Sequence, residues 1–174
     1  MNTSDTENTP NPIPELVPII SGRVNVADYL EKQVERQPSK RAIIVPETKK
    51  GGRNLYSQVT YAQLLDLTDR YAWGLTNAGV QFGDRVIVGI RPGVDLVAVT
   101  FALFKMGAVP VFIDPGMGKR GLLNCIAQVK GRVLIAEFKA HVISWIYKSK
   151  FKSVELFINV GKRSIGRMKS LHQL

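Results

Sequence analysis

The glycine-rich segment GMGKRG has the residue spacing with the most definite chemical meaning in this 174-residue chain. Gly116, Gly118 and Gly121 follow the G-x-G-x-x-G pattern, after the strand-like run VPVFI and before a helix-like stretch. Glycines placed in this way let a pyrophosphate approach backbone amides at a helix N-terminus. Glu137, at the end of the next strand-like run, could then hold a ribose hydroxyl. The segment is a candidate dinucleotide site.

Asp114 and Pro115 stand between the strand-like run and these glycines. Pro115 removes one backbone amide, and Asp114 would place a negative charge beside the phosphates. We therefore favour the second interpretation of the segment, a turn that connects a strand to a helix. For Asp114 itself we favour a capping or turn role over a catalytic one, although α/β folds often place functional groups after a strand.

Three residues have types suited to nucleophilic catalysis. His141 and Ser144 are one helical turn apart, but no carboxylate lies nearby in sequence to orient the histidine as a base. We expect a surface pair. Cys125 is the only cysteine, and its place in LLNCIAQV predicts a small buried hydrophobic residue rather than a nucleophile. One cysteine excludes an internal disulfide, and with only two histidines it argues against structural zinc.

Lysines alternate with other side chains in YKSKFKS, where Lys148, Lys150 and Lys152 have the basic and aromatic mixture found at nucleic-acid contacts. Alternating lysines also suit a strand or loop edge, where they prevent edge-to-edge association, and we favour that interpretation. All the excess positive charge lies in the last third of the sequence. Residues 119–174 carry 12 Lys and Arg against 2 Asp and Glu, whereas residues 1–118 are balanced. This basic third predicts either a surface for nucleic acid or anionic membrane, or a face that packs against acidic residues of another segment.

Periodic apolar residues predict the elements that carry these side chains. Thr60 and Gln63 have the spacing of a capping box, and Gly79 suits a left-handed C-cap. Helices are expected at 26–36, 60–77, 94–106, 119–129 and 140–147, and strands at 42–45, 55–59, 85–90, 109–113, 132–136 and 154–158. Residues 96–113 contain only one charge, Lys105, but Gly107 and Pro110 favour a buried helix, a turn and a strand over a membrane span.

Strands and helices alternate after residue 85, which predicts an α/β fold with a mostly parallel sheet and helices on both faces. We expect a mobile N-terminal arm at 1–23, one folded unit at 24–160 and a basic tail at 161–174. The N-terminus has no basic, apolar run of secretory type, and the single thiol suits a reducing compartment, so we expect a cytoplasmic protein.

Two motifs resemble the N-terminal part of the adenylate-forming (AMP-binding) superfamily, which includes acyl-CoA synthetases. Thr60, Tyr61 and Leu64 match its Thr-Tyr-x-x-Leu helix start, and the run FKMGAVPVFIDP, from Phe104 to Pro115, matches its Leu-Lys-Ala-Gly-Ala motif. The segment RPGVDLVAVTFALFKMGAVPVFIDPGMG is most similar to the fatty-acid CoA ligase-like β-lactone synthetases of olefin biosynthesis. This resemblance implies that residues 24–160 form the N-terminal subdomain of such an enzyme, and that GMGKRG is a turn shared by the subgroup.

The same resemblance implies an intact enzyme that joins a fatty-type carboxylate to ATP with magnesium, forming acyl-AMP and pyrophosphate. The superfamily's phosphate loop, adenine segment, hinge acid and C-terminal lysine have no match here, so no catalytic, cofactor-binding or metal residue is assigned. We expect a truncated fragment that is inactive alone and binds no cofactor by itself, with a separately encoded C-terminal half as a possible partner. Whether the parent makes a thioester or a β-lactone stays open. The alternative is a stand-alone module that binds a dinucleotide or nucleic acid.

Overall fold

A five-stranded parallel sheet forms the centre of the computed structural model, which describes residues 24–46, 55–161 and 169–173. Its strands are β3 (Arg85–Gly89), β4 (Val109–Phe112), β5 (Val133–Ala136), β6 (Leu156–Asn159) and β7 (Lys169–Ser170). Their spatial order is β4-β3-β5-β6-β7, and all four neighbouring pairs run parallel. The α/β fold with a mostly parallel sheet that the sequence predicts is confirmed.

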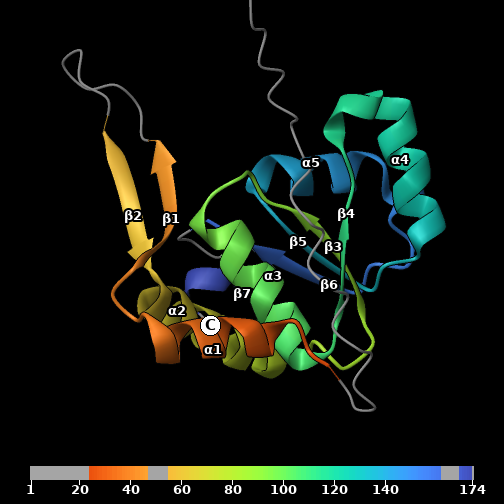
Figure 1. The fold of residues 1–174 in the computed structure, drawn as a ribbon. Helices are drawn as coiled ribbons and strands as arrows, with labels where there is room; N and C mark the ends of the chain where they lie inside the picture. The colour runs from red at the N-terminus through yellow and green to blue at the C-terminus, as the bar shows by residue number, and fades with distance from the viewer. Residues whose placement is uncertain (1–23, 47–54, 162–168, 174) are drawn as a thin grey trace, which may run out of the picture.

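Helices cover both faces of this sheet (Figure 1). One face carries α1 (Ala27–Arg36), α2 (Tyr61–Ala78) and α3 (Val94–Met106), and the other carries α4 (Gly118–Val129) and α5 (Phe138–Ile146). The described ranges also contain three short 3-10 helices: η1 (Pro115–Met117), η2 (Lys148–Lys150) and η3 (Leu171–Gln173). The bounds of α3 are the ones that the sequence predicts.

Alternate residues of the central strands build two separate cores. On β3, Val86 and Val88 pack with α1, α2 and α3, whereas Ile87 packs with α4. On β5, Ile135 belongs to the first core and Leu134 to the second. A strand buried on both faces is the reason that these segments read as continuous apolar runs in the sequence.

The start and the end of α2 follow the signals in the sequence. The Thr60 hydroxyl accepts a hydrogen bond from the Gln63 amide at 3.3 Å, and the Gln63 side chain accepts one from the Thr60 amide at 3.0 Å. Gly79 ends the helix with a positive φ of 102°. The predicted capping box and C-cap are confirmed, and together they satisfy backbone groups that a helix end leaves without intrahelical partners.

The apolar stretch at 96–113 forms most of α3, a turn at Gly107 and strand β4, as predicted. Lys105 lies near the end of α3 and donates to the carboxylates of Glu31 and Asp69, both at 2.7 Å. These contacts tie α3 to α1 and to α2. Within the described ranges no helix is long and apolar enough to cross a membrane.

Two antiparallel strands, β1 (Arg41–Pro46) and β2 (Tyr56–Thr60), form a separate ribbon that projects from the rest of the molecule (Figure 1). Both strands are predicted from the sequence, and residues 47–54 between them lie outside the described residues. An isolated two-stranded ribbon is marginally stable in water. Its base is held to α2, because Tyr61 donates its backbone N–H to the Lys40 carbonyl at 3.0 Å.

The two ends of the chain were predicted to be an arm and a basic tail. The predicted arm at 1–23 lies outside the described residues. In the predicted tail at 161–174, Lys169 and Ser170 pair with β6, and the side chain of Leu171 is buried in the first core. No sequence signal marks a strand of two residues, and the domain limits themselves stay predictions.

An ion pair fixes the amino edge of the sheet, where β3 and β5 begin. The guanidinium of Arg132 holds both carboxylate oxygens of Asp84, with an Nε–Oδ1 distance of 2.7 Å, and also donates to the Gly79 carbonyl at 2.6 Å. The hydrogen bond from Arg132 lowers the pKa of the Asp84 carboxyl, against the opposing effect of burial. The carboxylate is therefore charged in the folded chain at neutral pH.

Candidate functional site at the carboxyl edge of the sheet

The carboxyl edge of the sheet, where the parallel strands end, contains the point at which the chain reverses its winding direction. From β3 the chain passes through α3 to β4 on one side, and from β4 it crosses through α4 to β5 on the other side of β3. Open α/β sheets bind ligands in the crevice outside the carboxyl ends of the strands at such a switch point. The ends of β3 and β5 are therefore the candidate site.

Close backbone packing brings these two strand ends together. A Cβ atom added to Gly89 would lie 3.1 Å from the Cβ of Ala136. The backbone N–H of Glu137 donates to the Gly89 carbonyl at 3.2 Å. A side chain at position 89 would therefore push against β5, which explains the glycine at this place.

An ion pair links the segments that follow β3 and β5 at the switch point. Arg91 follows β3 and donates from Nε to the Oε1 atom of Glu137 at 2.5 Å. The Arg91 side chain is 85% exposed, so this pair contributes little to stability. Glu137, the proposed partner of a ribose hydroxyl, is engaged by Arg91 in this structure, and a ligand hydroxyl would compete with the guanidinium.

The glycine turn GMGKRG lies at the end of β4, which is the edge strand, and not at the switch point. Asp114 accepts a hydrogen bond from the Gly116 backbone N–H at 2.7 Å, so the carboxylate occupies an amide that a phosphate would need. Gly118 begins α4 with a positive φ of 78°. Dinucleotide binding at this turn stays a prediction, and it requires Asp114 to release the Gly116 amide.

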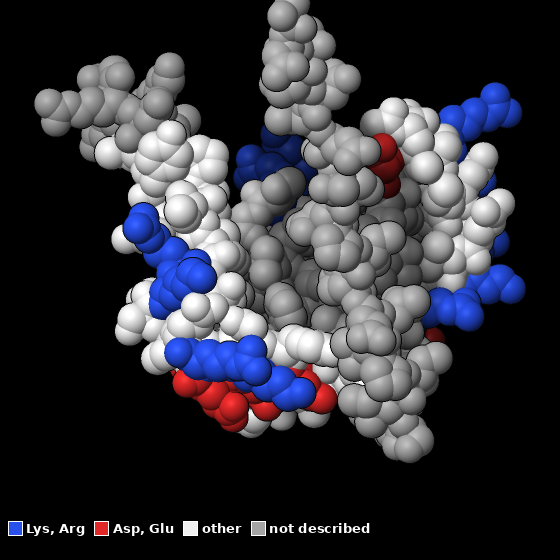
Figure 2. Space-filling model, in the orientation of Figure 1, with Lys and Arg blue, Asp and Glu red and all other residues white. Residues whose placement is uncertain are grey.

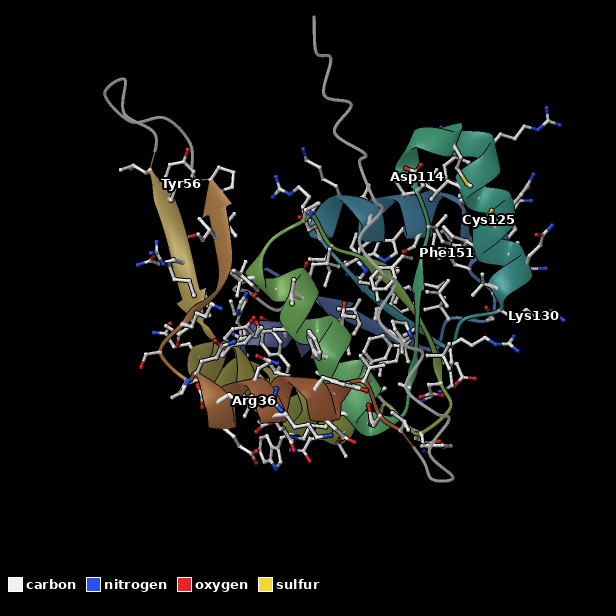
Figure 3. The ribbon with its side chains drawn as sticks, in the orientation of Figure 1. Arg36, Tyr56, Asp114, Cys125, Lys130 and Phe151 are labelled. Carbon is white, nitrogen blue, oxygen red and sulfur yellow. The ribbon has the colours of Figure 1, made fainter. Side chains whose placement is uncertain are left out.

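Asp114 and Cys125 both contact residues that lie close to them along the chain. Figure 3 shows Asp114 at the end of β4 and Cys125 on α4. The bond from Gly116 confirms the turn role that we favoured for Asp114. Cys125 is half-buried and not fully buried as predicted, and its Sγ lies 3.6 Å from the Sδ of Met117.

The expectation of a surface pair at His141 and Ser144 is wrong. The His141 side chain is 0% exposed, and its Nε2 lies 3.2 Å from the Ala136 carbonyl and 3.1 Å from the Ile158 carbonyl. Ser144 is also buried and donates to the backbone carbonyl of His141 at 2.7 Å, not to the ring. Burial lowers the pKa of His141, although the two carbonyls raise it in part. The histidine is thus a neutral link between the ends of β5 and β6.

The lysine-rich segment forms the 3-10 helix η2 and the turn after it, not a strand. Lys150 donates to the side chain of Asn124 on α4 at 3.1 Å, and Phe151 is buried in the second core. Lys148 and Lys152 are exposed. The alternating lysines thus lie in a helical turn and a loop, which agrees with the loop edge that we favoured over a nucleic-acid contact.

A polar cluster that the sequence does not predict lies at the start of α3. The Tyr71 hydroxyl donates to the Asp95 carboxylate at 2.7 Å and lies 3.3 Å from Nδ1 of His172. His172 Nε2 is 3.6 Å from the same carboxylate. Burial, reinforced by the Asp95 carboxylate, raises the pKa of the Tyr71 hydroxyl, so this group is a neutral donor. The cluster ties α2, α3 and η3 together beside a hollow of about 430 Å³.

The acids at the carboxyl edge do not fit a magnesium ion as they stand. Glu137 bonds Arg91, and Asp114 bonds the Gly116 amide. Across the described ranges, no three His, Cys, Asp or Glu side chains lie close enough together to hold a metal ion.

Comparison with known proteins identifies the family of this chain. Residues 30–164 match the family described as AMP-binding enzyme. The olefin beta-lactone synthetase of Stenotrophomonas maltophilia (strain K279a) is 32% identical over 142 residues, which are 80% of this chain and 26% of the relative. The enzyme of the same name from Xanthomonas campestris pv. campestris is 33% identical over 131 residues, covering 70% of this chain and 23% of the relative. The chain thus spans about a quarter of the length of these curated relatives.

Solved structures show the same fold. A long-chain-fatty-acid-CoA ligase from Archaeoglobus fulgidus superimposes with a TM-score of 0.72 at 23% identity, over 87% of this chain and 29% of the ligase. The anthranilate CoA ligase AuaEII, solved in complex with anthranoyl-AMP, gives a TM-score of 0.70 at 19% identity, over 86% of this chain and 27% of that protein.

Proposed function

Because this chain belongs to the AMP-binding enzyme family, we propose that it forms the N-terminal lobe of an ATP-dependent acyl-activating ligase. In the proposed reaction a carboxylate oxygen attacks the α-phosphorus of ATP. The bond from that phosphorus to the bridging oxygen breaks, and acyl-AMP and pyrophosphate are the products. The match of residues 30–164 to the family is the observation that carries this proposal.

The described residues favour a scaffolding role for this lobe. The switch point at the ends of β3 and β5 carries Arg91 and Glu137, which bond each other, and Asp114 bonds the glycine turn. None of these groups is poised as a nucleophile or a base toward a reacting atom. The lobe would contribute the carboxyl edge of its sheet as one wall of the active site, and the groups that bind ATP and magnesium would come from the remaining three-quarters of an enzyme of the relatives' length.

A fatty-acid-type carboxylate is the substrate class that the relatives favour. The Stenotrophomonas and Xanthomonas relatives are olefin beta-lactone synthetases, and a structural neighbour is a long-chain-fatty-acid-CoA ligase. The proposed parent would pass its acyl-AMP either to a thiol, giving a thioester, or to an internal β-hydroxyl, giving a β-lactone. The groups that decide between these steps would lie outside this lobe.

Exchange of labelled pyrophosphate into ATP tests the proposal, because exchange requires reversible acyl-AMP formation. We expect the purified chain to give no exchange with long-chain or β-hydroxy fatty acids. Mixing it with the segment of the Stenotrophomonas relative that follows the aligned 142 residues should produce exchange that depends on the fatty acid.

The two parts of this experiment address different claims. Exchange by the chain alone would overturn its inactivity, and it would show that the described residues do assemble an adenylating site. A folded mixture in which the two polypeptides bind each other without exchange would contradict the role as a competent N-terminal lobe. The second result would also remove the support for a separately encoded C-terminal half as partner.

A further inference from the structure

Helix α5 presents an apolar stripe to solvent on its outer face. Phe138, Val142, Trp145 and Ile146 have the spacing of one helix face, and the inner face buries His141. Trp145 is 48% exposed and Ile146 is 68% exposed. The rings of Phe138 and Trp145 meet edge to face, with centroids 6.3 Å apart. The pair therefore forms a preassembled aromatic ridge on the surface.

The segments on this side of the sheet are rich in basic residues. Residues 118–152 carry eight Lys and Arg, of which Arg132 is held by Asp84 at the amino edge of the sheet, against one acid, Glu137, which bonds Arg91. Lys139 is exposed on the same side of α5 as Ile146, about two helical turns away, and Lys148 follows the end of the helix.

Contacts join the basic residues of α4 and η2 to the end of α5. The Nζ atom of Lys119 lies 4.7 Å from the ring centroid of Tyr147, at the C-cap of α5. Lys150 donates to Asn124 on α4. The basic residues of α4 and η2 therefore adjoin the C-terminal end of α5, and we call the exposed surface of these three elements the α4–α5 face.

The opposite face of the sheet has a different charge. Helices α1, α2 and α3 together carry six acids and four basic residues. In Figure 2 the largest group of red carboxylates lies over α1, whereas blue side chains project along the edge that α4 occupies. The second tryptophan, Trp73 on α2, is 67% exposed on this other face. The chain thus has one basic face and one mixed face, each with a single exposed tryptophan.

We infer that the α4–α5 face docks on an anionic membrane surface, with Phe138, Trp145 and Ile146 at the headgroup boundary and the lysines on the lipid phosphates. Aromatic and aliphatic side chains on one helix face with flanking lysines are the features of interfacial binding, and neither signal alone gives stable attachment. A second copy would bring two basic faces together, and a nucleic acid would leave the aliphatic Ile146 without a partner. In this arrangement the face lies on the membrane surface, and none of the described helices is long and apolar enough to cross it. This inference does not depend on the proposed function.

The two tryptophans provide the test. Trp73→Phe leaves Trp145 as the only tryptophan, and Trp145→Phe leaves Trp73. The probes are vesicles of phosphatidylcholine alone and vesicles that also contain phosphatidylserine. We expect the Trp145 emission to shift to the blue with phosphatidylserine and to be quenched by brominated lipid, while Trp73 emission stays unchanged.

Binding to the same vesicles, measured by co-sedimentation, adds matched variants. Ile146→Ser should lower the partition coefficient about tenfold, and Lys139→Gln or Lys148→Gln should each lower it about fivefold. Lys32→Gln, on the exposed surface of α1, is the charge control and should leave it unchanged. Far-UV circular dichroism of every variant confirms that the fold is retained.

Three results would overturn the inference. The first is the absence of a blue shift for Trp145 on phosphatidylserine vesicles when the chain is folded. The second is an equal response of Trp73 and Trp145. The third is a Trp145 shift of the same size with soluble RNA or poly-glutamate, since that would identify a site for soluble polyanions or acidic peptides instead of a lipid surface.

Discussion

Replacing Arg132 by alanine should cost more stability than replacing any exposed arginine, because Arg132 holds a nearly buried carboxylate. The Asp84 side chain is only 11% exposed, and Arg132 supplies bonds to both of its oxygens and to the Gly79 carbonyl. Asp84 retains one further bond, from the Gln81 amide at 2.7 Å. Removing one partner of a buried pair costs about 3 kcal/mol in the free energy of unfolding, because the other charge is left without compensation. We expect about 3 kcal/mol here.

Two further substitutions calibrate this value. Arg132→Lys keeps the charge but loses the planar fork, so about 1–2 kcal/mol should be lost. Arg70→Ala is the matched control, because Arg70 pairs with Asp66 at 2.8 Å on the surface of α2 with both side chains 68% exposed. A pair of this kind contributes about 0.3–0.5 kcal/mol. Urea unfolding, followed by far-UV circular dichroism at neutral pH, measures all three.

The pH dependence gives an independent check. Arg132 lowers the pKa of folded Asp84, so the folded chain binds fewer protons than the unfolded chain as the pH falls toward the carboxyl range. The stabilisation is complete above the unfolded carboxyl value of about 3.9 and is lost as the pH falls through the lower folded value. The difference between the parent chain and Arg132→Ala should therefore shrink below about pH 4. A cost no larger than that of Arg70→Ala, or a cost that is constant as the pH falls, would refute the reasoning.

Three other substitutions have defined outcomes. Tyr71→Phe should cost about 1–2 kcal/mol in urea unfolding, because the partly buried Asp95 carboxylate loses its hydroxyl donor; no loss would contradict that bond. His141→Phe should flatten the decline of stability below about pH 6.5, because the buried ring has a lowered pKa and the unfolded chain binds the proton first; an unchanged slope would contradict a neutral His141. Gly107→Ala should lower the thermal midpoint by about 4–8 °C, because φ is +71° and the added Cβ would lie 2.4 Å from the Phe82 ring; an unchanged midpoint would contradict this geometry.

Local signals predict much of the fold. The Thr60 hydroxyl and Gln63 form their capping box, Gly79 takes its left-handed conformation, and α3 has its predicted bounds because all three depend on neighbours in sequence. The strand β7 carries no such signal, because two residues, Lys169 and Ser170, are held only by pairing with β6.

Helix α5 shows where local reasoning fails. Most of its residues are apolar, and hydrophobicity alone would turn Trp145 and Ile146 toward the core. The structure instead buries His141 and Ser144, because the His141 ring bonds the carbonyls of Ala136 and Ile158 at the ends of two strands. Those carbonyls come together only after the sheet has formed, so this reversal could not be read from the helix by itself.

The polar groups at the carboxyl edge were predicted only in part. Asp114 could be given its turn role because Gly116 is two residues away. The partnership of Tyr71 with Asp95 spans 24 residues and that of Tyr71 with His172 spans 101, so no spacing rule connects them. The partnership of Arg91 with Glu137 depends on β3 and β5 becoming neighbours across the α4 crossover.

A chimeric enzyme tests the central claim most directly. In it, the 142 aligned residues of the Stenotrophomonas olefin beta-lactone synthetase are replaced by the matching segment of this chain, and fatty-acid-dependent exchange of pyrophosphate into ATP is measured. If this chain is a competent N-terminal lobe of an acyl-activating ligase, the chimera should retain exchange within about tenfold of the parent enzyme, a loss of no more than 1.4 kcal/mol of transition-state stabilisation. A folded chimera without exchange, in a preparation where the parent enzyme is active, would contradict the claim.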